Sequence, residues 1–412
     1  MAITRIDATR LIPGGGDPIP NGTVVIDGPR IAYAGAAAGA PDVAADVVLT
    51  VETVMPGMWD THTHFMGLAR GVVNLEALLT QIPHIGILRA ARDAVAALEA
   101  GFTSVREVGG YGAILAIAID EGVIPGPNVY GAGAGISQTA GHGDFHAIGP
   151  AEANALTERH WGAPALADGP DDCRRVVRRQ LRLGAKVIKV CASGGVMSQV
   201  DHPIHQQFTA EELAAIVEEA ARADRVVAAH CHGKPGIMAA IEAGVRTIEH
   251  GSYLDEEAAT AMKETGTILV PTRWIVEHLA AVGRAQGMPE YAATKLDTIV
   301  QRHAEAVAIA VSAGVTVACG TDIWGAGMWG RNGEELVHLV SLGMTPLEAI
   351  RAATAVGPST LGPQAPLSGV LATGHDADVI TVSGDPTDDI SVLADPSRIE
   401  NVWKAGVRVK GG

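Results

Sequence analysis

The chain has 412 residues, 47% of them hydrophobic, so it is long enough for one large domain with a small one. Its formal net charge of −16 argues against the basic surface that nucleic acids and anionic membranes require. No apolar run is long enough to span a membrane, and the amino terminus lacks the apolar core of a secretory signal. We therefore expect a small-molecule partner, and neither a nucleic acid nor a membrane.

The four cysteines indicate a reducing compartment. Cys173, Cys191, Cys231 and Cys319 show no CxxC spacing, and three of them lie in apolar runs typical of strands. Such cysteines are best interpreted as buried, reduced thiols. The expected location is the cytoplasm.

Both chain ends have the pattern of short strands. Residues 1–53 alternate polar and apolar side chains between turns rich in glycine and proline, as in "PGGGDP", and residues 362–412 are similar. We predict that 1–53 and 362–412 together form a small β-sandwich domain. The catalytic domain is then 54–361.

The middle of the chain alternates strands with helices, as in parallel βα units. Predicted strands are 53–64, 103–110, 128–137, 186–195, 226–233, 247–252, 267–273 and 316–322. Predicted helices are 88–101, 171–185, 209–224, 235–245 and 294–315. Eight strands predict an α/β fold, a (β/α)8 TIM barrel. The alternative, a doubly wound open sheet, would carry a GxGxxG turn after an early strand, and none is found there.

Residues of the types that bind metals stand at the ends of these strands. In a βα barrel such ends gather at one face. The residues are His62, His64, Lys189, His230, His250 and Asp322. Each alone has an ordinary structural explanation, such as a hydrogen-bonded core histidine or an aspartate that caps a helix. Packing does not explain six of them at the mouth of one barrel.

Lys189 suggests how two ions share the site. Its amine lies in the apolar run "VIKVCASGG", where burial lowers the pKa and favours the neutral form. A neutral amine adds carbon dioxide, and the resulting carbamate can bridge two cations. We expect His62, His64 and Asp322 to hold one divalent ion, and His230 and His250 the other. Zn²⁺ suits these ligands best, and the pair would activate a bridging hydroxide.

The motifs "PGMWDTHTH", "VIKVCASGG", "HCHG", "IEHGS" and "CGTD" occur in the order found in the amidohydrolase superfamily, which the chain resembles over almost its whole length. It is most similar to the imidazolonepropionase-like branch, which includes metal-dependent Xaa-Pro and carboxy-terminal Lys/Arg dipeptidases and ochratoxin amidases. The resemblance implies a binuclear centre with a carbamylated lysine. It also implies a homo-oligomer, since several relatives are octamers.

Two positions leave alternatives open. Lys186 lies three residues before Lys189, where relatives often have an acidic residue, and we choose Lys189 because it lies deeper in the apolar run. His232 shares a face with His230. The family pattern places the ligand first, so we choose His230 and keep His232 as the alternative.

The resemblance also implies roles in catalysis. Asp322 would accept a proton from the hydroxide and pass it to the leaving amine. His142, in a "GHGD" loop that lies over the metals in relatives, would donate to the developing oxyanion. For the substrate we expect Arg273 to bind a carboxylate, Ser193 to add a hydrogen bond, and Trp329 to form a pocket wall.

The leading hypothesis is therefore a binuclear amidohydrolase acting on an N-acyl amino acid or dipeptide, including prolidase-like or ochratoxin-type aromatic amides. The alternative is hydrolysis of another C–N or ester-type bond, in a cyclic amide, carbamate or phosphotriester. Deaminases of the superfamily generally lack the bridging lysine, and a non-catalytic paralogue would lack ligands. Neither agrees with this sequence.

Overall fold

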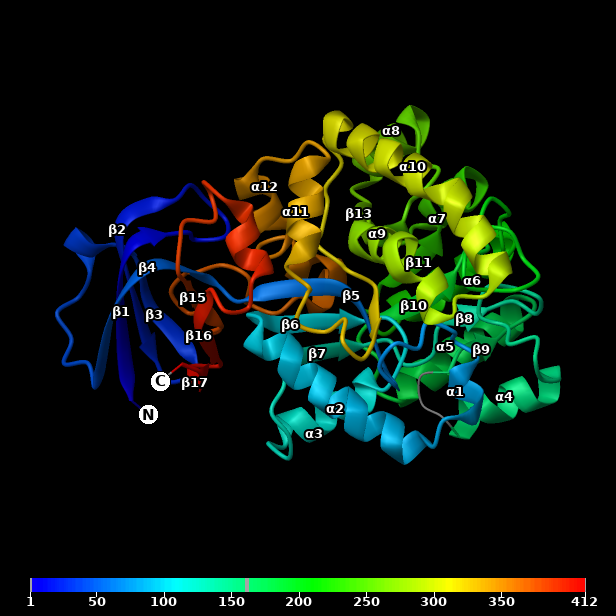
Figure 1. Cartoon of the computed structure of the whole chain (residues 1–412), viewed down its shortest axis with the longest axis horizontal. Coiled ribbons are helices and arrows are strands. Elements are labelled where there is room, and N and C mark those ends of the chain that lie inside the picture. The colour runs from blue at the N-terminus through cyan, green and yellow to red at the C-terminus, as the bar shows by residue number, and fades with distance from the viewer. Residues whose placement is uncertain (1, 160–162, 412) are drawn as a thin grey trace.

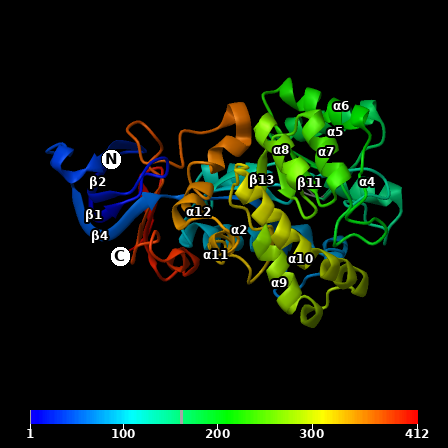
Figure 2. The same cartoon turned by 90° about the horizontal axis from the view of Figure 1, so that it is seen from above.

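The structure is a computed structural model that describes residues 2–159 and 163–411. Figure 1 shows a sheet built from both chain ends beside a larger region of strands and helices, and Figure 2 shows the same two parts from above. The sequence analysis predicts this pairing of the two ends. The exact division at residues 53 and 362 stays a prediction, because β4 of the terminal sheet continues to Pro56.

The terminal sheet contains strands from both ends of the chain. In spatial order they are β17 (Val407–Lys410), β16 (Ile399–Lys404), β15 (Val379–Val382), β4 (Val47–Pro56), β1 (Ile3–Leu11), β2 (Ile19–Asp27) and β3 (Arg30–Ala36). β4 joins the two ends, because it pairs with β1 in parallel and with β15 antiparallel. Ile6, Val24, Val54, Val379 and Trp403 form part of its apolar core. These strands belong to one hydrogen-bonded sheet, and the division into a two-layer sandwich stays a prediction.

The larger region contains two parallel sheets. One has the order β14 (Ile323–Gly325), β5 (Met58–Leu68), β6 (Phe102–Glu107), β7 (Asn128–Gly131). The other has the order β13 (Ile268–Val270), β12 (Thr247–His250), β11 (Val227–Cys231), β10 (Ile188–Cys191), β8 (Ile136–Ser137), β9 (Ala165–Leu166). Backbone bonds bridge the gaps between the sheets. Lys186 N, just before β10, donates to Gly131 O of β7, and Leu269 N of β13 donates to Thr316 O, in the segment that leads to β14. The arrangement is consistent with a TIM-barrel-like domain.

The helices pack around these sheets and cover their outer faces (Figures 1 and 2). The α-helices are α1 (Ala77–Thr80), α2 (Pro83–Glu99), α3 (Gly112–Asp120), α4 (Pro150–Arg159), α5 (Pro170–Arg182), α6 (Ala210–Ala221), α7 (Lys234–Ala243), α8 (Glu256–Thr265), α9 (Arg273–Val282), α10 (Glu290–Ala313), α11 (Glu334–Ser341) and α12 (Pro346–Ala352). Short 3₁₀ segments are η1 (Ala37–Gly39), η2 (Arg284–Gln286), η3 (Gly357–Gln364) and η4 (Ile390–Ala394). The five helices predicted from sequence correspond to α2, α5, α6, α7 and α10.

Local sequence explains where several helices begin and end. Thr209 and Glu212 form a capping box at the start of α6, and Thr345 and Glu348 do the same for α12. Gly244 ends α7 with φ of 87°, a left-handed conformation that glycine adopts without steric cost. The two capping boxes fix where their helices begin, and Gly244 fixes where α7 ends.

The strands are shorter than the sequence predicts. The predicted strand 128–137 is divided into β7 and β8, and within 316–322 only Val317 makes an isolated bridge. The chain regains strand pairing after Asp322, where β14 runs beside β5. The irregular segments lie where the parallel strands end, which is where a site is expected.

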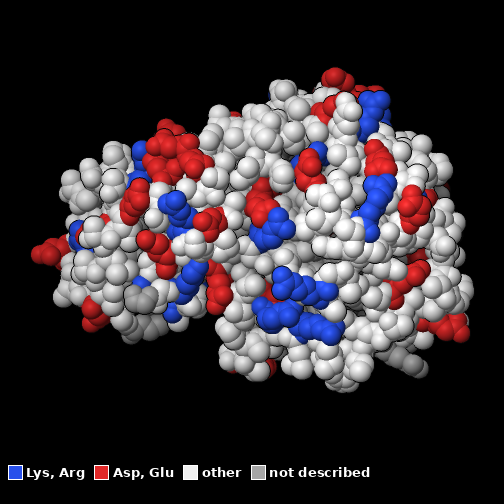
Figure 3. Space-filling model, viewed as in Figure 1, with Lys and Arg blue, Asp and Glu red and all other residues white. Residues whose placement is uncertain are grey.

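The charged surface, the cysteines and the helices can be compared with what the composition predicts. Figure 3 shows both acidic and basic side chains on the face in view, with a group of basic ones at the lower centre and a group of acidic ones at the upper left. All four cysteines are buried and unpaired by disulfides. Among the described residues, no helix is both long enough and apolar enough to cross a membrane.

Candidate metal centre

Strand geometry brings the six predicted ligands to one pocket. His62 and His64 lie two residues apart on β5, so their side chains can share one face. β11 and β12 pair in parallel, with Cys231 opposite His250, so His230 and His250 lie at the ends of neighbouring strands. The pocket is lined by all six: His62, His64, Lys189, His230, His250 and Asp322.

The first group of ligand atoms belongs to His62, His64 and Asp322. Nε2 of His64 lies 3.2 Å from Oδ1 of Asp322, and Nε2 of His62 lies 3.6 Å from the same oxygen. One ligand atom from each residue lies within 4.8 Å of the others. Burial alone would raise the pKa of Asp322, but His62 and His64 hold it below its usual value. The carboxylate is therefore ionised and suited to bind a cation.

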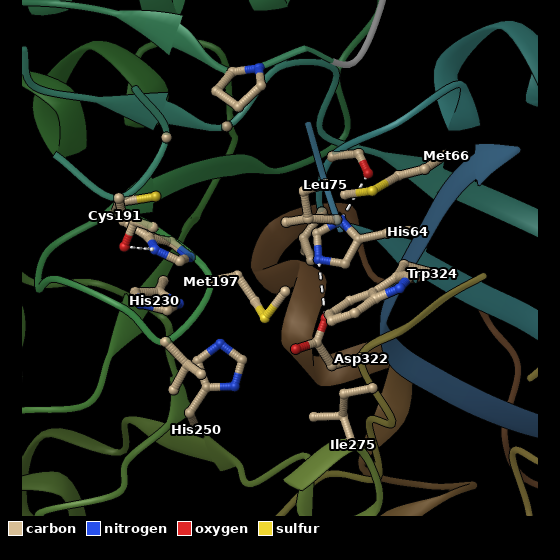
Figure 4. Close-up of a pocket in the computed structure, with 18 of the residues that line it drawn as sticks. His64, Met66, Leu75, Cys191, Met197, His230, His250, Ile275, Asp322 and Trp324 are labelled. Atoms are coloured by element: carbon tan, nitrogen blue, oxygen red, sulfur yellow. Dashed lines mark hydrogen bonds and ion pairs between the residues drawn. The ribbon is translucent and has the colours of Figure 1, made fainter. Parts of the chain in front are cut away.

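The second group contains three histidines. Ligand atoms of His230, His232 and His250 lie within 4.8 Å of one another. The structure thus adds His232, the alternative kept in the sequence analysis, to the two chosen ligands. Burial lowers the pKa of all three imidazoles, so they are neutral and have lone pairs available. Figure 4 shows His230 and His250 on one side of the pocket, with His64 and Asp322 on the other.

On four of these rings Nδ1 is engaged by a hydrogen bond, so Nε2 is the nitrogen available to bind a metal. The Nδ1 atoms of His64, His232 and His250 contact Gly109 O, Ser252 Oγ and Thr272 Oγ1 respectively, each at 2.7 Å. Nδ1 of His62 contacts Glu249. Fixing one ring nitrogen in this way orients the other toward a metal. His230 differs, because its Nε2 contacts Gly194 O at 3.2 Å, so Nδ1 is the nitrogen available to bind a metal.

Lys189 lies between β8 and β11 on the buried strand β10. Only 4% of the residue is exposed, and burial lowers the pKa of its amine. Within the part of the chain that the structure describes, no hydrogen bond or ion pair engages its Nζ. A buried ammonium without a partner is costly, so the position favours a neutral or modified amine. Lys186, the alternative, is exposed.

The backbone at this site is unusual. His250, Thr272 and Asp322 have φ of 70°, 56° and 59°, in the left-handed region that residues other than glycine seldom adopt. His250 ends β12, Thr272 lies two residues beyond β13, and Asp322 ends the predicted strand 316–322. Such conformations cost energy and concentrate at functional sites. Two of the three, His250 and Asp322, line the pocket themselves.

The rest of the pocket is largely apolar. Its walls include Met66, Leu75, Phe145, Met197, Ile275 and Trp324. Lys189 is the only lysine among the described lining residues, and no arginine lines the pocket. The pocket walls therefore suit an apolar or aromatic group.

His142 reaches the pocket as expected. It lies on the loop after β8, and its ring stacks on that of His230 with a centroid distance of 4.2 Å. Its Nδ1 lies 2.9 Å from Ser198 Oγ. The loop therefore places an imidazole beside the second group of ligands.

Three residues expected to bind substrate do not line the pocket. Arg273 begins α9, donates to Val300 O on α10 and forms an ion pair with Glu277 on α9 itself. The hydroxyl of Ser193 is buried and accepts from the backbone N of His232. Trp329 stacks on Phe65 outside the pocket, and Trp324 takes the place in the wall. These placements do not support the roles predicted for the three residues.

Sequence reasoning missed the residues that support the ligands. Glu249 and Arg106 are fully buried charges on β12 and β6, and Nη2 of Arg106 lies 2.7 Å from Oε1 of Glu249. Glu249 and Arg106 could have been found from sequence, because each is a charged residue inside a predicted strand. Asp201 and Lys295 also form a buried ion pair near the pocket, and their sequence surroundings give no comparable signal.

A comparison with protein families matches the Amidohydrolase family over residues 53–409. Ochratoxinase from Aspergillus niger is 45% identical over 421 aligned residues, covering 99% of this chain and 87% of that protein. The A. niger ochratoxinase crystal structure superposes with a TM-score of 0.93, covering 100% of this chain and 96% of the other at 44% identity.

Two further solved structures are similar over their full lengths. A prolidase complexed with N-methylphosphonate-L-proline is 34% identical with a TM-score of 0.91, and a Xaa-Pro dipeptidase with bound methionine is 31% identical with a TM-score of 0.88. In both cases 100% of this chain and 100% of the other are covered.

Proposed function

The chain belongs to the amidohydrolase family and is a hydrolase acting on amide bonds. We propose that it uses two divalent cations to hydrolyse an N-acyl amino acid or dipeptide with apolar groups. The observation that carries this proposal is the pair of ligand groups beside buried Lys189 in an apolar pocket.

The residues present fit two ions. His62, His64 and Asp322 would hold one, and His230 and His250, with His232 adjacent, would hold the other. Carbamylated Lys189 would bridge them, which gives its buried, unpartnered amine a favourable state. Neutral imidazoles and carboxylates suit Zn²⁺. When bound, such a pair polarises a carbonyl and supplies hydroxide at neutral pH.

Asp322 is the proposed proton carrier. Its carboxylate lines the pocket and is held ionised by His62 and His64. An ionised carboxylate beside the reacting atoms can accept a proton from the attacking water. The same group can then release that proton to the departing amine, as a general base followed by a general acid.

The pocket walls support an apolar substrate. Met66, Leu75, Met197 and Trp324 would contact aliphatic or aromatic parts of the acyl or amine group. The similarity to ochratoxinase and to Xaa-Pro dipeptidases supports cleavage of an amide next to an amino acid. Arg273, bonded to Glu277 and to Val300 O, is not included in this proposal.

A substrate panel tests the proposal. The zinc-loaded protein would be assayed with N-acyl-phenylalanine, N-acyl-lysine and apolar dipeptides, beside a carbamate and a phosphotriester. We expect release of phenylalanine from the first, with higher kcat/KM than for the charged analogue. Turnover of the carbamate or phosphotriester alone would contradict an amidase.

A further inference from the structure

His142 is held by polar contacts with residues that the proposed reaction does not use. Nδ1 faces the hydroxyl of Ser198 at 2.9 Å, and the backbone N donates to Oε1 of Gln207 at 3.1 Å. A Cβ at Gly195 would lie 2.1 Å from Nδ1, so only glycine leaves room for the ring. These contacts, together with the space at Gly195, hold the imidazole in one position.

Asp201 connects the two residues that contact His142, Ser198 and Gln207. One of its carboxylate oxygens accepts from the Ser198 hydroxyl. The other accepts from the backbone N of Gly195 at 3.1 Å and from Nε2 of Gln207 at 2.9 Å. His142 is therefore held at its ring and at its backbone by two residues that converge on one carboxylate.

Lys295 fixes Asp201 from a different part of the chain. It lies on α10, and its Nζ contacts Oδ1 of Asp201 at 3.1 Å, with side chains only 11% and 5% exposed. The same amine donates to the carbonyl oxygens of Gly195 and Ser198 at 3.1 and 2.8 Å. Burial alone would raise the pKa of Asp201, but the hydrogen bond from Ser198 and the charge of Lys295 hold it below its usual value. The carboxylate is ionised.

This arrangement decides where the hydrogens lie. An ionised carboxylate only accepts hydrogen bonds, so the single hydroxyl hydrogen of Ser198 points to Asp201. The Ser198 oxygen must then accept from His142, which places a hydrogen on Nδ1. In the neutral ring, Nε2 consequently carries a lone pair.

We propose that Asp201 and Lys295, acting through Ser198, are positioning residues that fix His142 with its hydrogen on Nδ1, so that Nε2 serves as a hydrogen-bond acceptor in the pocket. His142 then pairs with a donor of the substrate, such as an amide N–H. This differs from the sequence-based expectation of an oxyanion donor. Its place in catalysis rests on the proposed function, whereas the position of the hydrogen does not.

The first test observes the hydrogen directly. The zinc-loaded protein is labelled with ¹⁵N at histidine, and comparison with His142→Gln identifies the His142 signals. We expect a protonated Nδ1 and an unprotonated Nε2. In the variant Asp201→Ala with Lys295→Met, the Ser198 hydroxyl loses its carboxylate acceptor and keeps only Gly195 O, at 3.2 Å. It can then also donate to Nδ1, so part of the hydrogen should move to Nε2. Nε2–H in the unaltered protein would overturn the proposal, whether or not amides are hydrolysed.

The second test is kinetic. Ser198→Ala should lower kcat about 10- to 100-fold with metal content unchanged, and Ser198→Thr, which keeps a hydroxyl, should recover most of it. In a His142→Ala background the same change should have less than about a 2-fold effect, because Ser198 acts only through His142. Ser359→Ala is the control, since that hydroxyl donates to Val356 O away from the pocket. An undiminished effect of Ser198→Ala without His142 would overturn the positioning role.

Discussion

Nδ1 of His62 lies 2.6 Å from a carboxylate oxygen of Glu249, although the two residues belong to strands of different sheets. The other oxygen of Glu249 faces Arg106 at 2.7 Å, and all three side chains are almost completely buried. Burial alone would raise the pKa of Glu249, but Arg106 and His62 hold it well below its usual value. The ionised carboxylate fixes His62 so that Nε2 faces the proposed ion.

Glu249→Gln is therefore expected to weaken metal binding. The amide keeps the shape but loses the charge that orients His62, so affinity at the first site should fall about 10- to 100-fold. Competition with a chromogenic chelator measures this in protein verified as folded by circular dichroism. Glu219→Gln, which alters an ion pair with Arg178 between α5 and α6 and away from the pocket, should leave the affinity unchanged. Equal affinities in both variants would contradict the role of Glu249.

Lys189→Ala should abolish turnover, because it removes the group proposed to bridge the ions. Short carboxylic acids should restore part of the activity by occupying the place of the carbamate. Lys186→Ala is the matched control, since that exposed side chain is three residues away and points outside the site. Normal turnover by the Lys189 variant would show that the bridge is assigned wrongly.

Reactivation of the metal-free protein should depend on bicarbonate and on pH. Burial lowers the pKa of Lys189, and only the neutral amine adds carbon dioxide. The neutral fraction increases with pH, so reactivation by Zn²⁺ at a fixed concentration of dissolved carbon dioxide should accelerate from about pH 6 to about pH 8. Stopped assays after timed reconstitution measure the rate. A rate independent of bicarbonate at every pH would argue against a carbamate.

Two tryptophans provide a matched test of the pocket wall. Trp324 lines the pocket, whereas Trp329 stacks on Phe65 with a centroid distance of 4.4 Å and does not line it. Trp324→Leu should raise KM for an aromatic amide about 10-fold, because apolar contact area is lost. Trp329→Leu should reduce thermal stability with KM nearly unchanged. The reverse pattern would restore Trp329 as the wall residue that the sequence analysis expected.

Sequence patterns could place the six candidate ligands at one site because those positions depend on local geometry. His62 and His64 share a strand face by alternation, and His230 and His250 stand at the ends of neighbouring parallel strands. The direction of Arg273 depends instead on Thr272, whose φ of 56° turns the chain into α9. Partners such as Asp201 and Lys295 are 94 residues apart, and only the folded structure brings them together.

The most direct measurement of the central claim is the release of phenylalanine from an N-acyl-phenylalanine by protein whose metal content is determined in the same sample. We expect about two divalent ions per chain and steady release, lost on chelation and restored by Zn²⁺. Full activity at a reproducible content near one ion would contradict the binuclear centre. Two bound ions without release of amino acid from any amide of the panel would contradict the proposed reaction.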